Sequence, residues 1–192
     1  MTSRRKNLRP VVGTILVASP LMARPEYKQI VILLIRKDTY GNMYGLALNR
    51  PGCVLVSELA PELEYCRFRA RSGGPREETE LSVIHTLGIT LPKSELLVHG
   101  PFSLNGDLDK LASLLDTHKV HSRDCVFVYG FFRWFADDFQ KELLEKNWYV
   151  IEATHDVVFT DQPETLWKKI IDSFGDNQTI VAQYINRLSL RN

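Results

Sequence analysis

Short apolar segments rich in β-branched residues, each followed by a turn sequence, dominate the first part of the chain. Residues 11–18, 30–35 and 44–49 have this character, and Gly41 lies in the turn between the second and the third. The pattern is typical of β-strands, and the aliphatic run at 30–35 indicates a strand buried on both faces. The sequence therefore predicts that the chain opens with a small β unit.

The second half of the chain adds helices. Apolar residues recur every three or four positions at 107–118 and 137–146, and Pro163 and Gly175 suit the two ends of a third helix. Further elements are expected as strands at 68–72, 96–99, 126–129 and 148–151 and as a last helix at about 177–189. No linker separates the halves, so we predict one mixed α/β domain over residues 11–192.

Residues 1–10 carry a charge that the rest of the chain does not share. They hold Arg4, Arg5, Lys6 and Arg9 and no acid, which leaves 20 basic and 23 acidic residues in the other 182 positions. We interpret 1–10 as a flexible basic tail. A protein body with a net charge of −3 lacks the broad positive field that duplex binding needs, so we expect weak, non-specific nucleic-acid binding at most.

Export and membrane insertion are both disfavoured. The basic start followed by residues 11–18 imitates a signal peptide, but Pro10, Gly13 and Thr14 interrupt its apolar part. The longest aliphatic run, 30–35, is too short to span a bilayer. The three cysteines form no CxxC pair and are expected to be buried, reduced thiols. We therefore expect a cytoplasmic protein that does not contact a membrane.

Several short motifs occur in a fixed order over about residues 12–175. They are Gly13–Pro20, Tyr44–Pro51 with the sequence Tyr-Gly-Leu-Ala-Leu-Asn-Arg-Pro, Gly73-Gly74-Pro75 followed by Ile84-His85, and Gly130, Trp134 and Glu142 followed by Asn147-Trp148, Val158-Phe159 and Trp167. In this order they resemble the opening strand, the Gly-Leu-x-x-Asn-Arg-Pro motif, the Gly-Gly-Pro loop and the later Gly-Trp segment of the AlgH/YqgE family.

The resemblance implies a fold and a general role. The fold is a mixed α/β structure whose bifurcated β-sheet curls into a pseudo-barrel with flanking helices. The role is a bacterial regulatory one in gene expression, without an established reaction. The chain departs from the family pattern at Arg133, Asp137 and Asp138, where the family has glycine, glycine and glutamine. Replacing glycine by a charged residue adds bulk and removes backbone freedom at that loop.

Signatures of catalysis are absent from the sequence. It contains no Gly-x-Ser-x-Gly elbow, no His-Glu-x-x-His helix, no phosphate loop and no Gly-x-Gly-x-x-Gly. The five histidines have no metal-binding spacing with the cysteines or acids. We predict no catalytic residue, no metal site and no cofactor.

An arginine row is the best lead to a binding site. If residues 67–72 form a strand, Arg67, Arg69 and Arg71 project from one face, and Arg76 follows the Gly-Gly-Pro turn. Such a row suits a phosphate or a nucleic-acid backbone, and it equally suits a solvated strand face. We also expect Gly73 and Gly74 to supply positive φ angles in this turn.

Three further residues have two interpretations each. Arg50 either closes a ligand site at a strand end or pairs with an acid to lock its loop, in which case Asn49 bonds its own turn. Trp134 belongs to an aromatic cluster that is either core or an exposed patch for a partner.

Two functions follow from these observations. The first is a non-enzymatic binding or transcriptional-regulatory protein that acts through a protein partner. The alternative is an enzyme or sensor for a small anionic, phosphorylated ligand at an arginine-lined site. A deep pocket that holds Arg50 with one of Arg67, Arg69 and Arg71 would favour the alternative.

Overall fold

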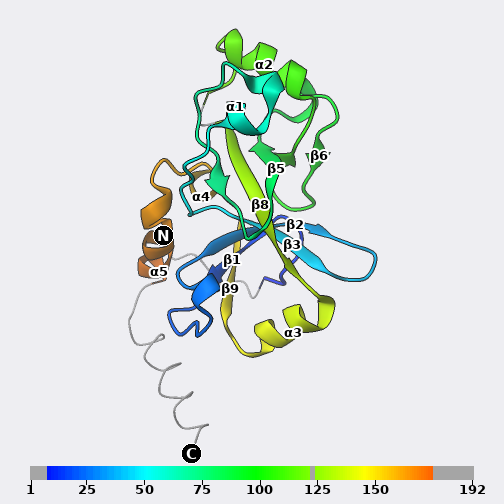
Figure 1. The fold of residues 1–192 in the computed structure, drawn as a ribbon. Helices are drawn as coiled ribbons and strands as arrows, with labels where there is room; N and C mark the ends of the chain where they lie inside the picture. The colour runs from blue at the N-terminus through cyan, green and yellow to red at the C-terminus, as the bar shows by residue number, and fades with distance from the viewer. Residues whose placement is uncertain (1–7, 122–123, 175–192) are drawn as a thin grey trace, which may run out of the picture.

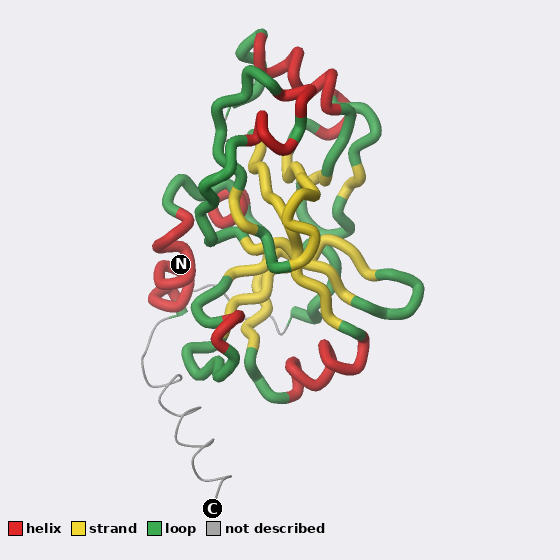
Figure 2. Tube along the Cα trace, in the orientation of Figure 1, coloured by secondary structure: helices red, strands yellow, loops and turns green. Residues whose placement is uncertain are grey.

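The β-strands form a single curled sheet, in which almost all neighbouring strands are antiparallel (Figures 1 and 2). The computed structural model describes residues 8–121 and 124–174. Its strands are β1 (Thr14–Ala18), β2 (Val31–Lys37), β3 (Met43–Ala47), β4 (Arg71–Ser72), β5 (Arg76–His85), β6 (Glu95–Leu96), β7 (Ser103–Leu104), β8 (Cys125–Trp134) and β9 (Trp148–Glu152). They are ordered β6-β7-β5-β8-β3-β2-β1-β9, and β4 pairs with β8 in parallel.

Strand β8 divides the sheet into two leaves. Its first half pairs with β5, from Cys125 opposite His85 to Tyr129 opposite Leu81, and its last three residues pair with β3. Between them lies Gly130, whose φ of +68° is a conformation that other residues rarely adopt. We call β4–β7 with the first half of β8 the upper leaf, and β1–β3 and β9 with its second half the lower leaf (Figure 1). The bifurcated, curled sheet expected from the family resemblance is confirmed.

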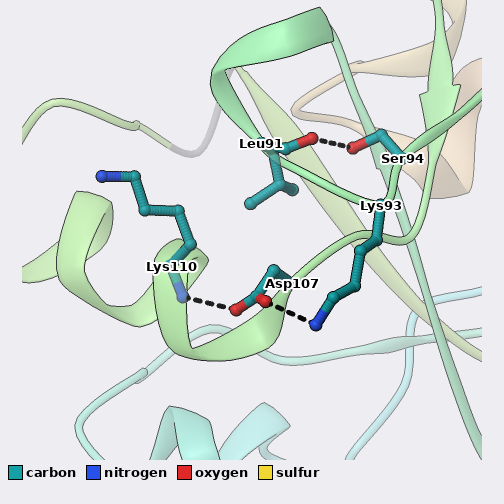
Figure 3. Close-up of polar contacts among 5 residues, drawn as sticks. All are labelled: Leu91, Lys93, Ser94, Asp107 and Lys110. Atoms are coloured by element: carbon teal, nitrogen blue, oxygen red, sulfur yellow. Dashed lines mark hydrogen bonds and ion pairs between the residues drawn. The ribbon is translucent and has the colours of Figure 1, made fainter.

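Helices cover the ends and sides of this sheet. The α-helices are α1 (Val56–Leu59), α2 (Leu108–Asp116), α3 (Ala136–Leu144), α4 (His155–Val158) and α5 (Pro163–Ser173), and the 3-10 turns are η1 (Pro25–Tyr27), η2 (Pro61–Leu63) and η3 (Gly88–Thr90). Figure 1 shows α1 and α2 over the upper leaf, α3 below the lower leaf and α5 at its side. The carboxylate of Asp107 caps α2 by accepting from the Lys110 amide at 3.0 Å, and it pairs with Lys93 at 2.8 Å (Figure 3).

Alternation along the lower strands builds an apolar layer on each face of the lower leaf. Ile15 and Leu33 belong to one layer, which includes residues of α5, whereas Leu16 and Ile32 belong to the other, which includes Phe139 of α3. Residues 31–34 are all fully buried, as expected for a strand covered on both faces. A third apolar cluster joins the upper leaf to α1 and α2.

Three local expectations need correction. Strand β8 is ten residues long, so the aromatic segment after residue 130 continues a strand that was expected to end at 129. The strand expected at 68–72 is reduced to Arg71–Ser72, with an isolated bridge between Leu55 and Arg69. The strand expected at 96–99 is the two-residue β6, and the last predicted helix lies outside the described residues, as does most of the predicted tail.

The Gly-Gly-Pro turn needs glycine for a different reason from the one expected. Neither Gly73 nor Gly74 has a positive φ. A Cβ atom on Gly73 would lie 2.3 Å from the Gly130 carbonyl oxygen, and one on Gly74 would lie 2.2 Å from the carbonyl carbon of Phe131. The two glycines therefore allow the backbone to pass directly against β8, which is a close approach rather than a special dihedral angle.

Candidate functional site

Arg71, which was expected on an exposed row, is directed into the protein. Its guanidinium group donates to the carbonyl oxygens of Leu48 at 2.8 Å, Val158 at 3.2 Å and Thr160 at 2.5 Å. Burial lowers the pKa of Arg71 to about 10, so the group still carries its charge at neutral pH. Arg71 therefore connects β3, β4 and the end of α4, and it does not share a surface with Arg67 and Arg69.

Asn49, Arg50 and Arg69 also bind the backbone. The side-chain amide of Asn49 accepts from the Val31 amide and donates to the Gln29 carbonyl, both at 2.8 Å. Arg50 donates to the Glu26 carbonyl and Arg69 to the Cys53 carbonyl. Burial lowers the pKa of the half-buried Arg50. These contacts favour a structural role for Asn49 and Arg50 but correct its details. Asn49 bonds residues 18 and 20 positions away rather than its own turn, and Arg50 bonds a backbone carbonyl rather than an acid.

Trp134 lies in the core of the lower leaf. It is 2% exposed, and its ring centroid lies 5.7 Å from those of Tyr27 and Phe139 and 6.2 Å from that of Trp148. Beside these rings the buried carboxylate of Glu142 accepts from Trp148 Nε1 at 2.8 Å. Arg24 lies 3.0 Å from the other carboxylate oxygen of Glu142. Burial raises the pKa of Glu142, and Trp148 and Arg24 oppose that rise. Trp134 therefore supports the core interpretation.

Arg67 lines a surface hollow that has a volume of about 800 Å³. The hollow lies between η2 and the end of α2, and we call it the η2–α2 hollow. Its acidic residues are Glu62, Glu64 and Asp116, and apolar side chains, among them Leu63 and Leu115, line the rest. Two histidines, Tyr65 and Cys66 also border it. Arg67 is thus set among acids, and the hollow as a whole is acidic.

Arg76 lies in the second hollow, of about 570 Å³, at the place where β8 leaves β5 and joins β3. We call it the fork hollow. Arg36 of β2 and Arg133 of β8 also line it, and in the sheet each of these two is directly opposite Tyr44 of β3. The guanidinium carbon of Arg36 lies 4.1 Å from the centroid of the Tyr44 ring, and that of Arg133 lies 5.6 Å from it. Sequence reasoning missed Arg36 and Arg133 because strand register alone brings them together.

A bulge in β5 supplies the acidic side of the fork hollow. Arg76 is opposite Phe131 and Leu81 is opposite Tyr129, so residues 77–80 of β5 face a single residue of β8. Glu77 in this bulge has a φ of +48°, which is unusual for a residue other than glycine. A hydrogen bond with Glu77 raises the pKa of Glu80, with burial and the charge of Glu77 adding to the rise. The bulge thus places two interacting carboxyl groups beside three guanidinium groups.

His85 and Ser94 have the separation of a base and a nucleophile, but their hydrogen bonds exclude that use. Ser94 Oγ lies 3.2 Å from His85 Nε2. The same hydroxyl donates to the Leu91 carbonyl at 2.6 Å, the bond drawn in Figure 3. His85 Nδ1 accepts from the Leu87 amide, so Nε2 carries the proton and donates to the Asn105 carbonyl at 2.7 Å. A protonated Nε2 cannot take a proton from the hydroxyl. Burial lowers the pKa of His85. Its ring is hydrogen-bonded to the backbone of Leu87 and Asn105, so its role is to hold these two loops together.

The other groups capable of chemistry are scattered. Within residues 8–121 and 124–174, no three His, Cys, Asp or Glu side chains come together as metal ligands. Cys66 and Cys125 are buried, and burial raises the pKa of the Cys125 thiol to about 12, whereas Cys53 is exposed, contrary to expectation. None of the helices in the described part of the chain has the length and apolar composition that a bilayer crossing requires.

The forked, curled α/β sheet is a fold that is also found in solved structures. The fold is similar to that of a protein from Corynebacterium diphtheriae, with a TM-score of 0.70, 20% identity and coverage of 86% of this chain and 87% of that one. It is also similar to the AlgH protein from Pseudomonas aeruginosa, with a TM-score of 0.68, 21% identity and coverage of 92% and 96%.

The sequence comparisons show the family. The sequence profile of the AlgH-like family matches residues 15–179, and the chain belongs to this family. A UPF0301 protein from Chlorobium limicola is 30% identical over 182 residues, which are 95% of each chain. Another from Chlamydia abortus is 28% identical over 166 residues, which are 85% of this chain and 86% of that one.

Proposed function

We propose that the protein is a non-enzymatic binding protein with a regulatory role, and that it binds a protein partner at the η2–α2 hollow. The observation that carries the proposal is the chemistry of this hollow. Glu62, Glu64 and Asp116 border it, and Leu63 and Leu115 give it an apolar lining. An amphipathic segment binds such a groove with its apolar face, and basic residues on the rim of that segment pair with the acids.

The same acids argue against direct recognition of DNA. A duplex is bound mainly by neutralising its phosphates, and carboxylates repel them. Of the arginines that the sequence suggested for this task, Arg69 and Arg71 donate to backbone carbonyls, and Arg67 lines the acidic hollow. The regulatory role implied by the family resemblance is therefore better served by contact with another protein.

Photo-crosslinking in living cells tests the proposal. A photoreactive residue at Tyr65, which is 70% exposed in the η2–α2 hollow, is expected to capture one protein repeatedly. The matched control is the same residue at Tyr40, which is 85% exposed and lies outside the hollow. Charge reversal by Glu62→Lys and Glu64→Lys should remove the crosslink from position 65 and leave the fold intact, because both side chains are exposed.

Two results would contradict the proposal. One is capture of the same protein from positions 65 and 40, with a crosslink yield that charge reversal does not change. The other is nanomolar, sequence-selective binding of the purified protein to a DNA duplex at physiological salt, measured by fluorescence anisotropy.

A further inference from the structure

We propose that the fork hollow is a binding site for a small phosphate monoester, held by Arg36, Arg76 and Arg133. The site is separate from the η2–α2 hollow and goes beyond the function proposed above. It also moves the small anionic ligand suggested by the sequence from residues 67–71 to a place where arginines from β2, β5 and β8 surround one cavity.

The three guanidinium groups are available to a ligand. No carboxylate whose side chain is described lies within 4.0 Å of any of them. The Nε atom of Arg133 is buried and has no hydrogen-bond acceptor among the described residues. An arginine donor that is removed from water without an acceptor costs free energy, and an anion that enters the hollow supplies the acceptor.

Aromatic rings hold two of these groups in place. Arg36 and Arg133 both lie over the ring of Tyr44, and the guanidinium carbon of Arg133 is also 4.9 Å from the centroid of the Phe135 ring. Tyr44 is itself buried and lies 5.7 Å, centroid to centroid, from Phe131. Guanidinium groups positioned in advance lose less entropy when they bind the oxygens of a phosphate in the bidentate manner.

The charge balance of the hollow selects a terminal phosphate. A monoester concentrates nearly two negative charges on one group that three arginines can surround. A phosphodiester chain has to continue past Glu77 and Glu80, which line the same hollow and repel it. The volume of about 570 Å³ is within the range of small-molecule sites and leaves room for the organic part of the ligand.

Isothermal titration calorimetry with phenyl phosphate as the probe tests the inference. We expect saturable binding with one site, and a rise in Kd of about tenfold or more in Arg133→Gln and Arg76→Gln, because each loses a charge-assisted contact. Arg76 is exposed, so its variant keeps the test valid if Arg133→Gln is unstable. Arg67→Gln makes the same change of charge outside the hollow and should leave Kd nearly unchanged.

A fourth variant tests the role of the acids. Glu80→Gln removes a charge that repels the ligand, so it should lower Kd for phenyl phosphate. Loss of packing cannot produce tighter binding, which makes this result specific to an electrostatic role.

The inference is overturned if phenyl phosphate does not bind the native protein in the millimolar range, or if Arg67→Gln weakens binding as much as Arg76→Gln does. Tighter binding of a short oligothymidylate without a terminal phosphate, or of a phosphoserine peptide, would assign the hollow to a macromolecule instead. The residues changed in the fork hollow, Arg76, Glu80 and Arg133, do not line the η2–α2 hollow, so failure here leaves the protein-partner proposal untouched.

Discussion

Replacement of Arg71 by methionine measures how strongly this side chain holds the fold together. The variant keeps an unbranched apolar chain but leaves three carbonyl oxygens, of Leu48, Val158 and Thr160, without their donor. A hydrogen bond from a charged donor contributes roughly 1.5–3 kcal/mol. Burial of the charge opposes this gain, since a pKa lowered from 12.5 to about 10 corresponds to roughly 3 kcal/mol of desolvation. We therefore expect Arg71→Met to lower the free energy of unfolding by about 3 kcal/mol.

Urea denaturation followed by circular dichroism gives this free energy, and thermal melting should show a fall in Tm of roughly 10 °C for a domain of this size. Arg67→Met is the matched control, because it removes the same group from an exposed position and should change stability by less than about 0.5 kcal/mol. A loss below about 1 kcal/mol in Arg71→Met would refute the reasoning, since it would mean that the three carbonyls find other donors.

Three further predictions follow from single features. Burial lowers the pKa of His85 below its ordinary 6.5, so the unfolded chain binds a proton that the native protein excludes. The free energy of unfolding should therefore fall as the pH drops below about 6.5. This fall should be much less steep in His85→Gln than in the control variant His121→Gln. Gly74→Ala should lower the free energy of unfolding, measured by urea denaturation, by more than about 3 kcal/mol, because its Cβ meets the backbone of β8. A Cβ on Gly88 meets nothing within 4 Å, so Gly88→Ala should lower it by only about 1 kcal/mol, for its φ of +53°. Equal losses in the two variants would contradict the close-approach argument. Deletion of residues 1–9 should leave Tm nearly unchanged, because the segment is basic and has no apolar periodicity, and a large loss would show that it docks.

Most of the fold could be read from the sequence because local patterns encode it. The aliphatic run of β2 gives a strand buried on both faces, and the apolar spacing of α2 gives a helix that begins at its Asp107 cap. The length of β8 could not be predicted, because the aromatic sequence of its second half has no clear strand pattern. That half is a strand because it pairs with β3, which is distant in the sequence. The fork itself came from the family resemblance and not from periodicity.

The candidate sites were less predictable, because they depend on which side chains from distant parts of the sequence come into contact in the fold. Arg67, Arg69 and Arg71 follow a strand-like alternation in sequence, yet the acceptor for Arg71 comes from Val158 and Thr160, almost 90 positions away. The fork hollow is the converse case. Arg36 and Arg133 are far apart in the chain, and only their common partner Tyr44 brings them together. A single sequence carries no signal for this kind of tertiary contact.

The position of β8 in the chain has a consequence for how the protein is made. Both leaves need this one strand, which begins at Cys125. The lower leaf also needs β9, from Trp148 to Glu152, which is its outer strand. A nascent chain that has released β1, β2 and β3 from the ribosome therefore holds a three-stranded fragment whose apolar layers have no cover. Neither half can reach its native state until about two thirds of the polypeptide has been synthesised. Biogenesis of this protein should consequently depend on protection of its early strands, and a pause in translation before residue 125 should be more harmful than one after residue 152.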